Sequence, residues 1–264
     1  MKPASFAYVR PKSWSEALQL LAGGARPGAG TQSLGPLLNL RLAQPDTVAD
    51  LRHLPDYAGV AVAGAVVRIG AGTTHAAIED GAVPDRVGEI MAAIARGIAY
   101  RPVRNRGTIG GSLAHADPAA DWVAVLPALG ATAVALGPKG ERRIAAAEFV
   151  KGIFETALAA DELLRFIEVP VQPAEARWGH WKFCRKVGEF SKATACVLAL
   201  PGKPPRAVLA ALDGPPMVIA DASALMKDPA AEAARIVKGI PDLAPWRRAI
   251  AETALRRAAA MAAA

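Results

Sequence analysis

Apolar and polar residues along the first 56 positions predict a small unit that alternates strands and helices. The stretches "FAYV" and "TVAD" have the short apolar character of strands. Between them, "SWSEALQLLA" spaces its apolar residues as a helix does, and Ser13 and Glu16 fit a capping box at its start. A glycine-rich turn follows, and then a second short helix is expected from about Leu37 to Leu42. This order is typical of an α/β unit.

Residues 57–172 predict a second unit that mixes strands and helices. A strand and a helix start are expected in "AVVRIGAGTTHAAIED", and helices in "VGEIMAAIARGIA" and "AADWVAVLPALG". A hairpin is expected to turn at residues 137–140, and "DELLRFIEVP" predicts a strand that ends at Pro170. After "VPVQPAEA", residues 173–264 predict two or three antiparallel strands followed by helices.

Composition and charge narrow the class of protein. The chain has 264 residues, of which 52% are apolar and 21% charged, as in a soluble globular protein. No apolar run reaches the ~18–20 residues of a membrane span, and the start lacks the apolar core of a signal peptide, so a cytoplasmic protein is expected. The net charge of +7 favours anionic ligands, but no basic stripe with interleaved aromatic residues indicates nucleic-acid binding.

Candidates for metal and nucleophile chemistry are weak. Two cysteines, Cys184 and Cys196, are too few for an iron–sulfur cluster, which normally needs four thiolates. His115, Asp117 and Asp121 could be read as metal ligands, but one histidine with two carboxylates after a turn is more often a loop and a helix cap. Ser112 lacks the G-x-S-x-G context of a hydrolase nucleophile. No metal site and no catalytic residue is therefore expected.

Two glycine-rich turns are the stronger candidates for chemistry. They are "GAGTQSLG", residues 28–35, and "GTIGGS", residues 107–112. Glycine permits positive φ and the close approach of a ligand, and successive backbone N–H groups followed by a helix start form an anion site. Neither turn completes a Rossmann or Walker motif, so each alone is most often a tight connection. Two such turns in adjacent units favour a long ligand with two phosphates, such as a dinucleotide.

Three segments together resemble one protein family. The segments "GAGTQSLGPLLNLRLAQPDTVADL", "RNRGTIGGSLAHADPAAD" and "KFCRKVGEFSKATA" are similar to the FAD-binding medium subunits of the molybdenum hydroxylases, among them carbon monoxide dehydrogenase and xanthine dehydrogenase. The resemblance implies an α+β protein with a two-subdomain FAD-binding fold of the VAO/PCMH type and a C-terminal α+β domain. The implied domains are residues 1–56, 57–172 and 173–264.

The resemblance also implies the residues that bind FAD. From the first turn they are Gly28, Ala29, Gly30, Thr31, Gln32, Ser33 and Leu34. From the second they are Gly107, Thr108, Gly110, Gly111 and Ser112, with Ile109 packed beneath. Beyond the turns, Asp121 matches a cofactor contact, Ile98 an apolar position, Leu164 a strand position beside the flavin, and Lys182 a basic contact.

The function implied by the resemblance is electron transfer within a larger enzyme. A large partner subunit would hold the molybdenum cofactor. A small partner subunit would carry two [2Fe–2S] clusters, which would need no cysteine ligands from this chain. The chain would take electrons from the clusters on FAD and pass them to an external acceptor, in a cytoplasmic dimer of heterotrimers. Two alternatives stay open from the residues alone. One is a stand-alone VAO-like flavin oxidoreductase, and the other is a non-enzymatic nucleotide-binding module.

Overall fold

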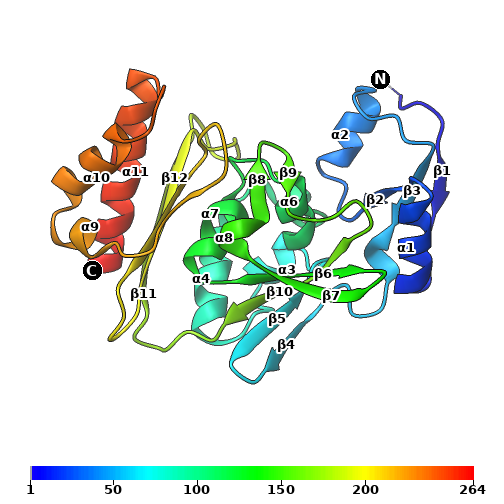
Figure 1. Ribbon diagram of the computed structural model, residues 1–264, viewed down its shortest axis with the longest axis horizontal. Coiled ribbons are helices and arrows are strands. Elements are labelled where there is room, and N and C mark those ends of the chain that lie inside the picture. Colours follow the sequence, from blue (N-terminus) through cyan, green and yellow to red (C-terminus); the bar gives the residue numbers. More distant parts are fainter. Residues whose placement is uncertain (1) are drawn as a thin grey trace.

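Three structural units follow one another along the chain in a computed structural model that describes residues 2–264. In Figure 1 the N-terminal unit lies on the right, the second unit in the centre and the C-terminal unit on the left. The second unit contacts both of the others, so residues from all three can share one site. The helices and sheets together confirm the α+β class expected from the sequence.

The N-terminal unit is a three-stranded parallel sheet with two helices. The strands pair in the order β1-β3-β2. The elements are β1 (Ala7–Val9), α1 (Trp14–Ala22), β2 (Arg26–Gly28), α2 (Leu34–Asn39) and β3 (Thr47–Asp50), followed by the 3-10 helix η1 (Leu51–His53). Helix α1 is capped as expected, because the Ser13 hydroxyl accepts from the Glu16 amide at 3.2 Å. The Glu16 carboxylate, however, accepts from the Lys12 amide rather than closing the box on Ser13.

Helix α2 begins earlier than the sequence predicted. The expected span was about Leu37 to Leu42, whereas the helix runs from Leu34 to Asn39. Pro36 is tolerated because it stands in the first turn, where backbone N–H groups have no helical acceptor. Arg41 has a φ of 57°, a left-handed conformation that stops the helix. The shift places the start of α2 directly after the first glycine-rich turn.

The second unit is a five-stranded antiparallel sheet with helices on one face (Figure 1). The strands pair in the order β4-β5-β10-β6-β7, and β8 and β9 form a separate hairpin. The strands are β4 (Val60–Ala63), β5 (Val66–Gly70), β6 (Thr132–Gly137), β7 (Gly140–Ala145), β8 (Val150–Gly152), β9 (Glu155–Thr156) and β10 (Leu163–Pro170). The helices are α3 (His75–Glu79), α4 (Asp85–Arg96), α5 (Arg101–Arg104), α6 (Ile109–His115), α7 (Asp121–Ala128) and α8 (Ala146–Phe149).

Strand alternation separates the two faces of this sheet. Val67 and Ile69 of β5 are fully buried against the helices. Between them, Arg68 points to the other face, where it donates to Glu168 at 2.8 Å. Arg143 donates to the same carboxylate, also at 2.8 Å. The period-two pattern thus gives one apolar face under the helices and one face that carries an ion-pair cluster.

The C-terminal unit is a four-stranded antiparallel sheet, where two or three strands were expected. Its elements are β11 (Arg177–Phe183), β12 (Ala193–Ala199), β13 (Arg206–Ala210), β14 (Met217–Ile219), α9 (Ser223–Lys227), α10 (Pro229–Lys238) and α11 (Pro245–Ala263). The short edge strand β14 follows "GPP", a sequence more typical of a loop, so its pattern gave no strand signal. In Figure 1 the sheet stands between helix α7 of the second unit and helix α11.

Both faces of this sheet are apolar because each one packs on a helix. In β12, Ala195 and Val197 belong to the core shared with α11, whereas Cys196 and Leu198 belong to the core of the second unit. At Gly179 the sheet meets α11 so closely that a Cβ would lie 2.0 Å from a carbonyl oxygen of the helix. The C-terminal unit is therefore packed firmly against the second unit, and one end of β11 reaches the pocket described next.

Candidate functional site

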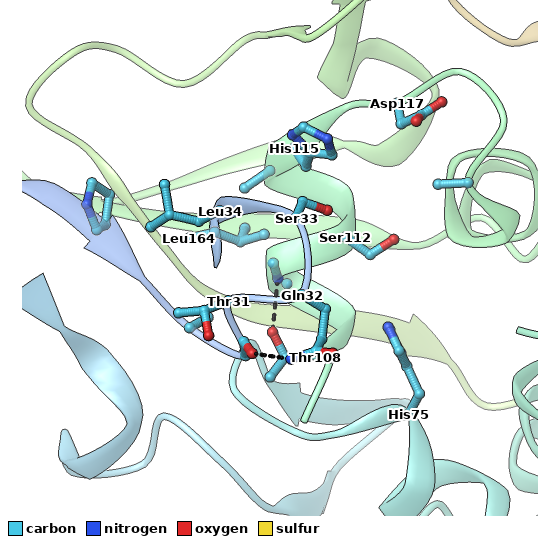
Figure 2. A pocket seen from close by; sticks show the side chains of 18 of the residues that line it. Thr31, Gln32, Ser33, Leu34, His75, Thr108, Ser112, His115, Asp117 and Leu164 are labelled. Atoms are coloured by element: carbon cyan, nitrogen blue, oxygen red, sulfur yellow. Dashed lines mark hydrogen bonds between the residues drawn. The ribbon is translucent and has the colours of Figure 1, made fainter. Parts of the chain in front are cut away.

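A cavity of about 610 Å³ lies where the three units meet. Ligand sites typically have volumes of ~300–1,000 Å³, so it can hold a large cofactor. Figure 2 shows the first glycine-rich turn crossing in front of helix α6, with Thr31, Gln32 and Ser33 on the turn and Thr108 and Ser112 on the helix side. Two segments that are far apart in the sequence therefore form facing walls of one pocket.

The pocket brings together most of the residues that the sequence singled out. Those on its wall are Ala29, Gly30, Thr31, Gln32, Ser33, Leu34, Ile98, Gly107, Thr108, Gly110, Gly111, Ser112, Asp121, Leu164 and Lys182. Two are not on the wall. Gly28 is the last residue of β2 and lies against Val48, while Ile109 is fully buried, consistent with its expected place beneath the turn.

The first turn presents backbone N–H groups that have no partner in the protein. Within residues 2–264, no acceptor is found for the amides of Gly30, Thr31, Gln32 and Ser33. The Gln32 side chain folds back and donates to the Gly30 carbonyl at 3.1 Å, and Thr31 holds a φ of 56°. Buried or half-buried N–H groups are normally paired, so four free donors in a row indicate an anionic or otherwise acceptor-rich ligand.

Glycines at this site serve contacts within the protein, which differs from the reason expected. A Cβ on Gly30 would lie 1.9 Å from the Arg106 carbonyl oxygen, and one on Gly110 would lie 2.4 Å from the Ala71 side chain. Gly30 thus lets the first turn pack on the backbone at the start of the second, and Gly110 lets helix α6 pack on the residue that follows β5. The ligand-facing property is the row of free amides that this close packing positions.

The second turn differs from its expected form. Residues 109–112 are the first turn of helix α6 rather than a free loop, because Thr108 is the helix N-cap and its hydroxyl accepts from the Gly111 amide at 3.0 Å. The Gly110 amide donates to Ala71, and the Ser112 amide to Thr108. The amides that were expected to face phosphates are thus largely used within the protein, and the Ser112 hydroxyl remains on the pocket wall.

Asp121 and Lys182, expected as separate contacts, form one ion pair. The Lys182 ammonium lies 2.9 Å from both Asp121 oxygens and donates to the Gly97 carbonyl at 2.8 Å. His180, two residues before Lys182 on β11, lies 3.6 Å from the same carboxylate. Burial, the largest cause, lowers the pKa of His180, although the Asp121 charge acts in the opposite direction. The pair joins the C-terminal unit to α7 at one end of the pocket.

The side chains of His115 and Asp117 have separate structural partners. The His115 ring stacks on Phe154 at 4.9 Å between centroids, and the Asp117 carboxylate accepts from the Ala119 amide at 2.9 Å. Asp121 is paired with Lys182 as described above. In residues 2–264 no group of three or more His, Cys, Asp or Glu side chains is arranged to hold a metal ion. None of the described helices is both long and apolar enough to cross a membrane.

Sequence reasoning missed His75 and Tyr57, which also lie on the pocket wall. His75 is 5% exposed, and its Nδ1 accepts from the indole N–H of Trp122 at 3.1 Å. Burial first, and then the charge of Arg104, lower the pKa of His75 to about 4. Burial likewise raises the pKa of the Tyr57 hydroxyl. Both residues lie outside the two glycine motifs. A histidine at the start of an apolar helix was the one signal that could have pointed to His75, and no comparable signal marks Tyr57.

The donor set fits the diphosphate of FAD. Free amides on the first turn and the Ser112 hydroxyl opposite are groups that bind acceptor oxygens. The apolar residues Leu34, Ile98 and Leu164 supply surface for flat rings. A wall of this kind, with few polar groups set in apolar surface, is usual for a large organic cofactor.

Comparisons with known proteins agree with this reading. Residues 4–172 match the model of the FAD-binding domain in molybdopterin dehydrogenase. The chain is 38% identical over 200 residues to the nicotine 6-hydroxylase medium subunit of Paenarthrobacter nicotinovorans, covering 75% of this chain and 70% of that protein. It is 39% identical over 202 residues to the carbon monoxide dehydrogenase medium chain of Afipia carboxidovorans, with the same two coverages of 75% and 70%.

Solved structures extend the likeness to the whole chain. A carbon monoxide dehydrogenase from Hydrogenophaga pseudoflava superposes with a TM-score of 0.90 at 30% identity, covering 99% of this chain and 98% of that one. Quinoline 2-oxidoreductase from Pseudomonas putida 86 gives a TM-score of 0.89 at 29% identity, covering 100% and 98%. The chain therefore belongs to the FAD-binding medium subunits of the molybdenum hydroxylases and is an oxidoreductase subunit whose cofactor is FAD.

Proposed function

We propose that this chain holds FAD in the pocket between the first glycine-rich turn and helix α6, and that it transfers electrons from [2Fe–2S] clusters of a partner subunit to an external acceptor. The row of free amides from Gly30 to Ser33, facing Ser112 across the pocket, carries the proposal. FAD supplies the redox chemistry when bound, because it can exchange electrons singly and in pairs. The protein's part is to bind and orient it.

Each wall of the pocket would bind a different part of FAD. The amides of the first turn would bind the diphosphate, and the Ser112 hydroxyl would bind it from the other side. Ile98 and Leu164 would pack on ring surfaces and exclude water from them. The Asp121–Lys182 pair would close the pocket toward the C-terminal unit and offer a charged contact there.

Partners follow from the same family membership. Relatives named as medium subunits or chains belong to enzymes of several subunits, and that naming gives the stand-alone flavin oxidoreductase no support. We therefore propose a large molybdopterin-binding partner and a small [2Fe–2S] partner, in a cytoplasmic dimer of heterotrimers. Cell fractionation tests the compartment, and light scattering on the purified complex tests the stoichiometry.

Rapid mixing of the purified complex with a reducing substrate tests the electron transfer. Relatives are named for nicotine, carbon monoxide, caffeine and glyceraldehyde, which form a first panel of substrates. With a substrate that reduces the clusters, flavin absorbance near ~450 nm should fall and then recover when an acceptor is added. Clusters that are reduced while the bound flavin stays oxidised would contradict the proposal.

A further inference from the structure

His75 lies on the pocket wall with one ring nitrogen bound to a neighbour and the other without a partner among residues 2–264. It is the first residue of α3 and is 5% exposed. Its Nδ1 accepts from Trp122, whereas the structure of residues 2–264 gives Nε2 no partner. In Figure 2 the His75 side chain points toward the side of the pocket where Ser112 lies.

The partner of Nδ1 determines the tautomer of His75. An indole nitrogen only donates, so the Nδ1 that accepts from Trp122 carries no proton. A neutral His75 therefore holds its proton on Nε2, the nitrogen without a protein partner. Burial among apolar residues, together with the nearby guanidinium of Arg104, keeps the pKa of the ring well below neutrality. The free edge of His75 is thus an uncharged hydrogen-bond donor at neutral pH.

Contacts of the second turn and of Arg104 fix the position of the His75 ring. Gly107 packs beside the Cδ2–Nε2 edge of the ring, and a Cβ there would crowd it, at 2.9 Å from Cδ2 and 3.1 Å from Nε2. The His75 amide donates to the Gly107 carbonyl at 2.9 Å, which fixes the helix start against the second turn. Arg104, bound to Glu79 at 2.7 Å, holds the other end of α3. The ring is therefore positioned before any ligand arrives.

We infer that His75 is a further FAD-binding residue, whose Nε2–H donates a hydrogen bond to an acceptor atom of the bound cofactor. The inference rests on the proposed function, that FAD occupies this pocket. An unpaired donor on a nearly buried side chain is costly, and a cofactor oxygen or ring nitrogen would satisfy it. An uncharged donor adds this contact without adding charge to the pocket.

Two substitutions separate this role from simple packing. In His75→Gln the side-chain amide can place an N–H where Nε2 stands, whereas in His75→Asn the amide can keep only the contact with Trp122. FAD is removed from the full-length chain and titrated back, with binding followed by flavin fluorescence. We expect His75→Asn to raise the dissociation constant for FAD about tenfold. The constant of His75→Gln should stay within about threefold of the wild-type value. Thermal unfolding without FAD serves as the control for folding.

Outcomes of this titration distinguish the inference from the proposed function. Wild-type chain that binds no FAD would overturn both. Wild-type binding together with equal affinities of the two variants, or tighter binding by His75→Asn, would overturn the inference alone, because a packing role would favour the variant that keeps Trp122.

A second measurement uses the unaltered chain, in case a variant does not fold. With ¹⁵N-labelled histidine, the Nε2–H signal of His75 should shift and exchange more slowly with water when FAD is added. A signal that is unchanged by a saturating amount of FAD would also overturn the inference.

Discussion

The Lys182 ammonium lies 2.9 Å from both carboxylate oxygens of Asp121, across the boundary between the C-terminal unit and helix α7. Both side chains are mostly shielded from water, at 18% and 9% exposure. Screening by solvent is therefore weaker than for a surface pair, and loss of one partner leaves the other charge poorly solvated. The pair links the sheet that packs on α11 to the wall of the cofactor pocket.

Replacing Lys182 with Met should destabilise the chain by about 1–3 kcal/mol, because the Asp121 carboxylate then loses its charged donor. The double variant Lys182→Met with Asp121→Asn should lose less than the sum of the two single variants. Urea unfolding of the four proteins measures the coupling. Effects that simply add would show that the two side chains do not act as a pair.

Thr108 should contribute to stability as the N-cap of α6. Thr108→Val removes the hydroxyl that accepts from Gly111 but keeps the shape of the side chain, and it should lower the free energy of unfolding by about 1 kcal/mol. Thr108→Ser keeps the hydroxyl and should lie close to the wild type. Denaturant titrations compare the three proteins, and equal midpoints for the Val and Ser variants would argue against this cap.

Acid should destabilise the chain through His75. Its pKa is about 4 in the folded protein, against about 6.5 when unfolded. Between these values the unfolded chain binds a proton that the folded chain does not, so the stability contribution is complete above about pH 6.5 and is lost as the pH falls toward 4. The slope approaches about 1.4 kcal/mol per pH unit within that window.

Unfolding of the wild type and His75→Gln at pH 7 and pH 5 isolates this effect from other titrating groups. The wild type should lose more stability than the variant over that interval. An identical loss in both proteins would show that His75 titrates normally in the folded state.

Local patterns in the sequence predict individual helices and strands, but not which distant segments meet in the fold. Periodicity identified α1 and α7, and the parallel order of the N-terminal unit follows its strand–helix alternation. Whether a glycine faces a ligand or a carbonyl depends on the partner segment, and Gly30 and Arg106 are 76 positions apart in the chain. The two motifs therefore indicated which residues line the pocket. They did not reveal that Gly30 is needed for contact with Arg106 and not for contact with a ligand.

The same limit explains the other differences at the site. Thr108 followed by a helix is a local cap signal that was read as a turn, because Gly110 and Gly111 are poor helix formers. The Asp121–Lys182 pair and the Trp122–His75 contact join segments that only the folded chain brings together. No periodicity or spacing within one segment could have revealed them.

FAD binding between the two glycine-rich segments is tested by comparing the variant Gly30→Ala with the control Gly35→Ala. A Cβ at position 30 would meet the Arg106 carbonyl at 1.9 Å and push the first turn away from α6, whereas a Cβ at position 35 has no heavy atom within 4 Å. Flavin content after purification and titration with FAD should be about one per chain for the wild type and Gly35→Ala. Folded Gly30→Ala should lose bound FAD, and full retention of FAD by that variant would rule out FAD binding between the first turn and helix α6.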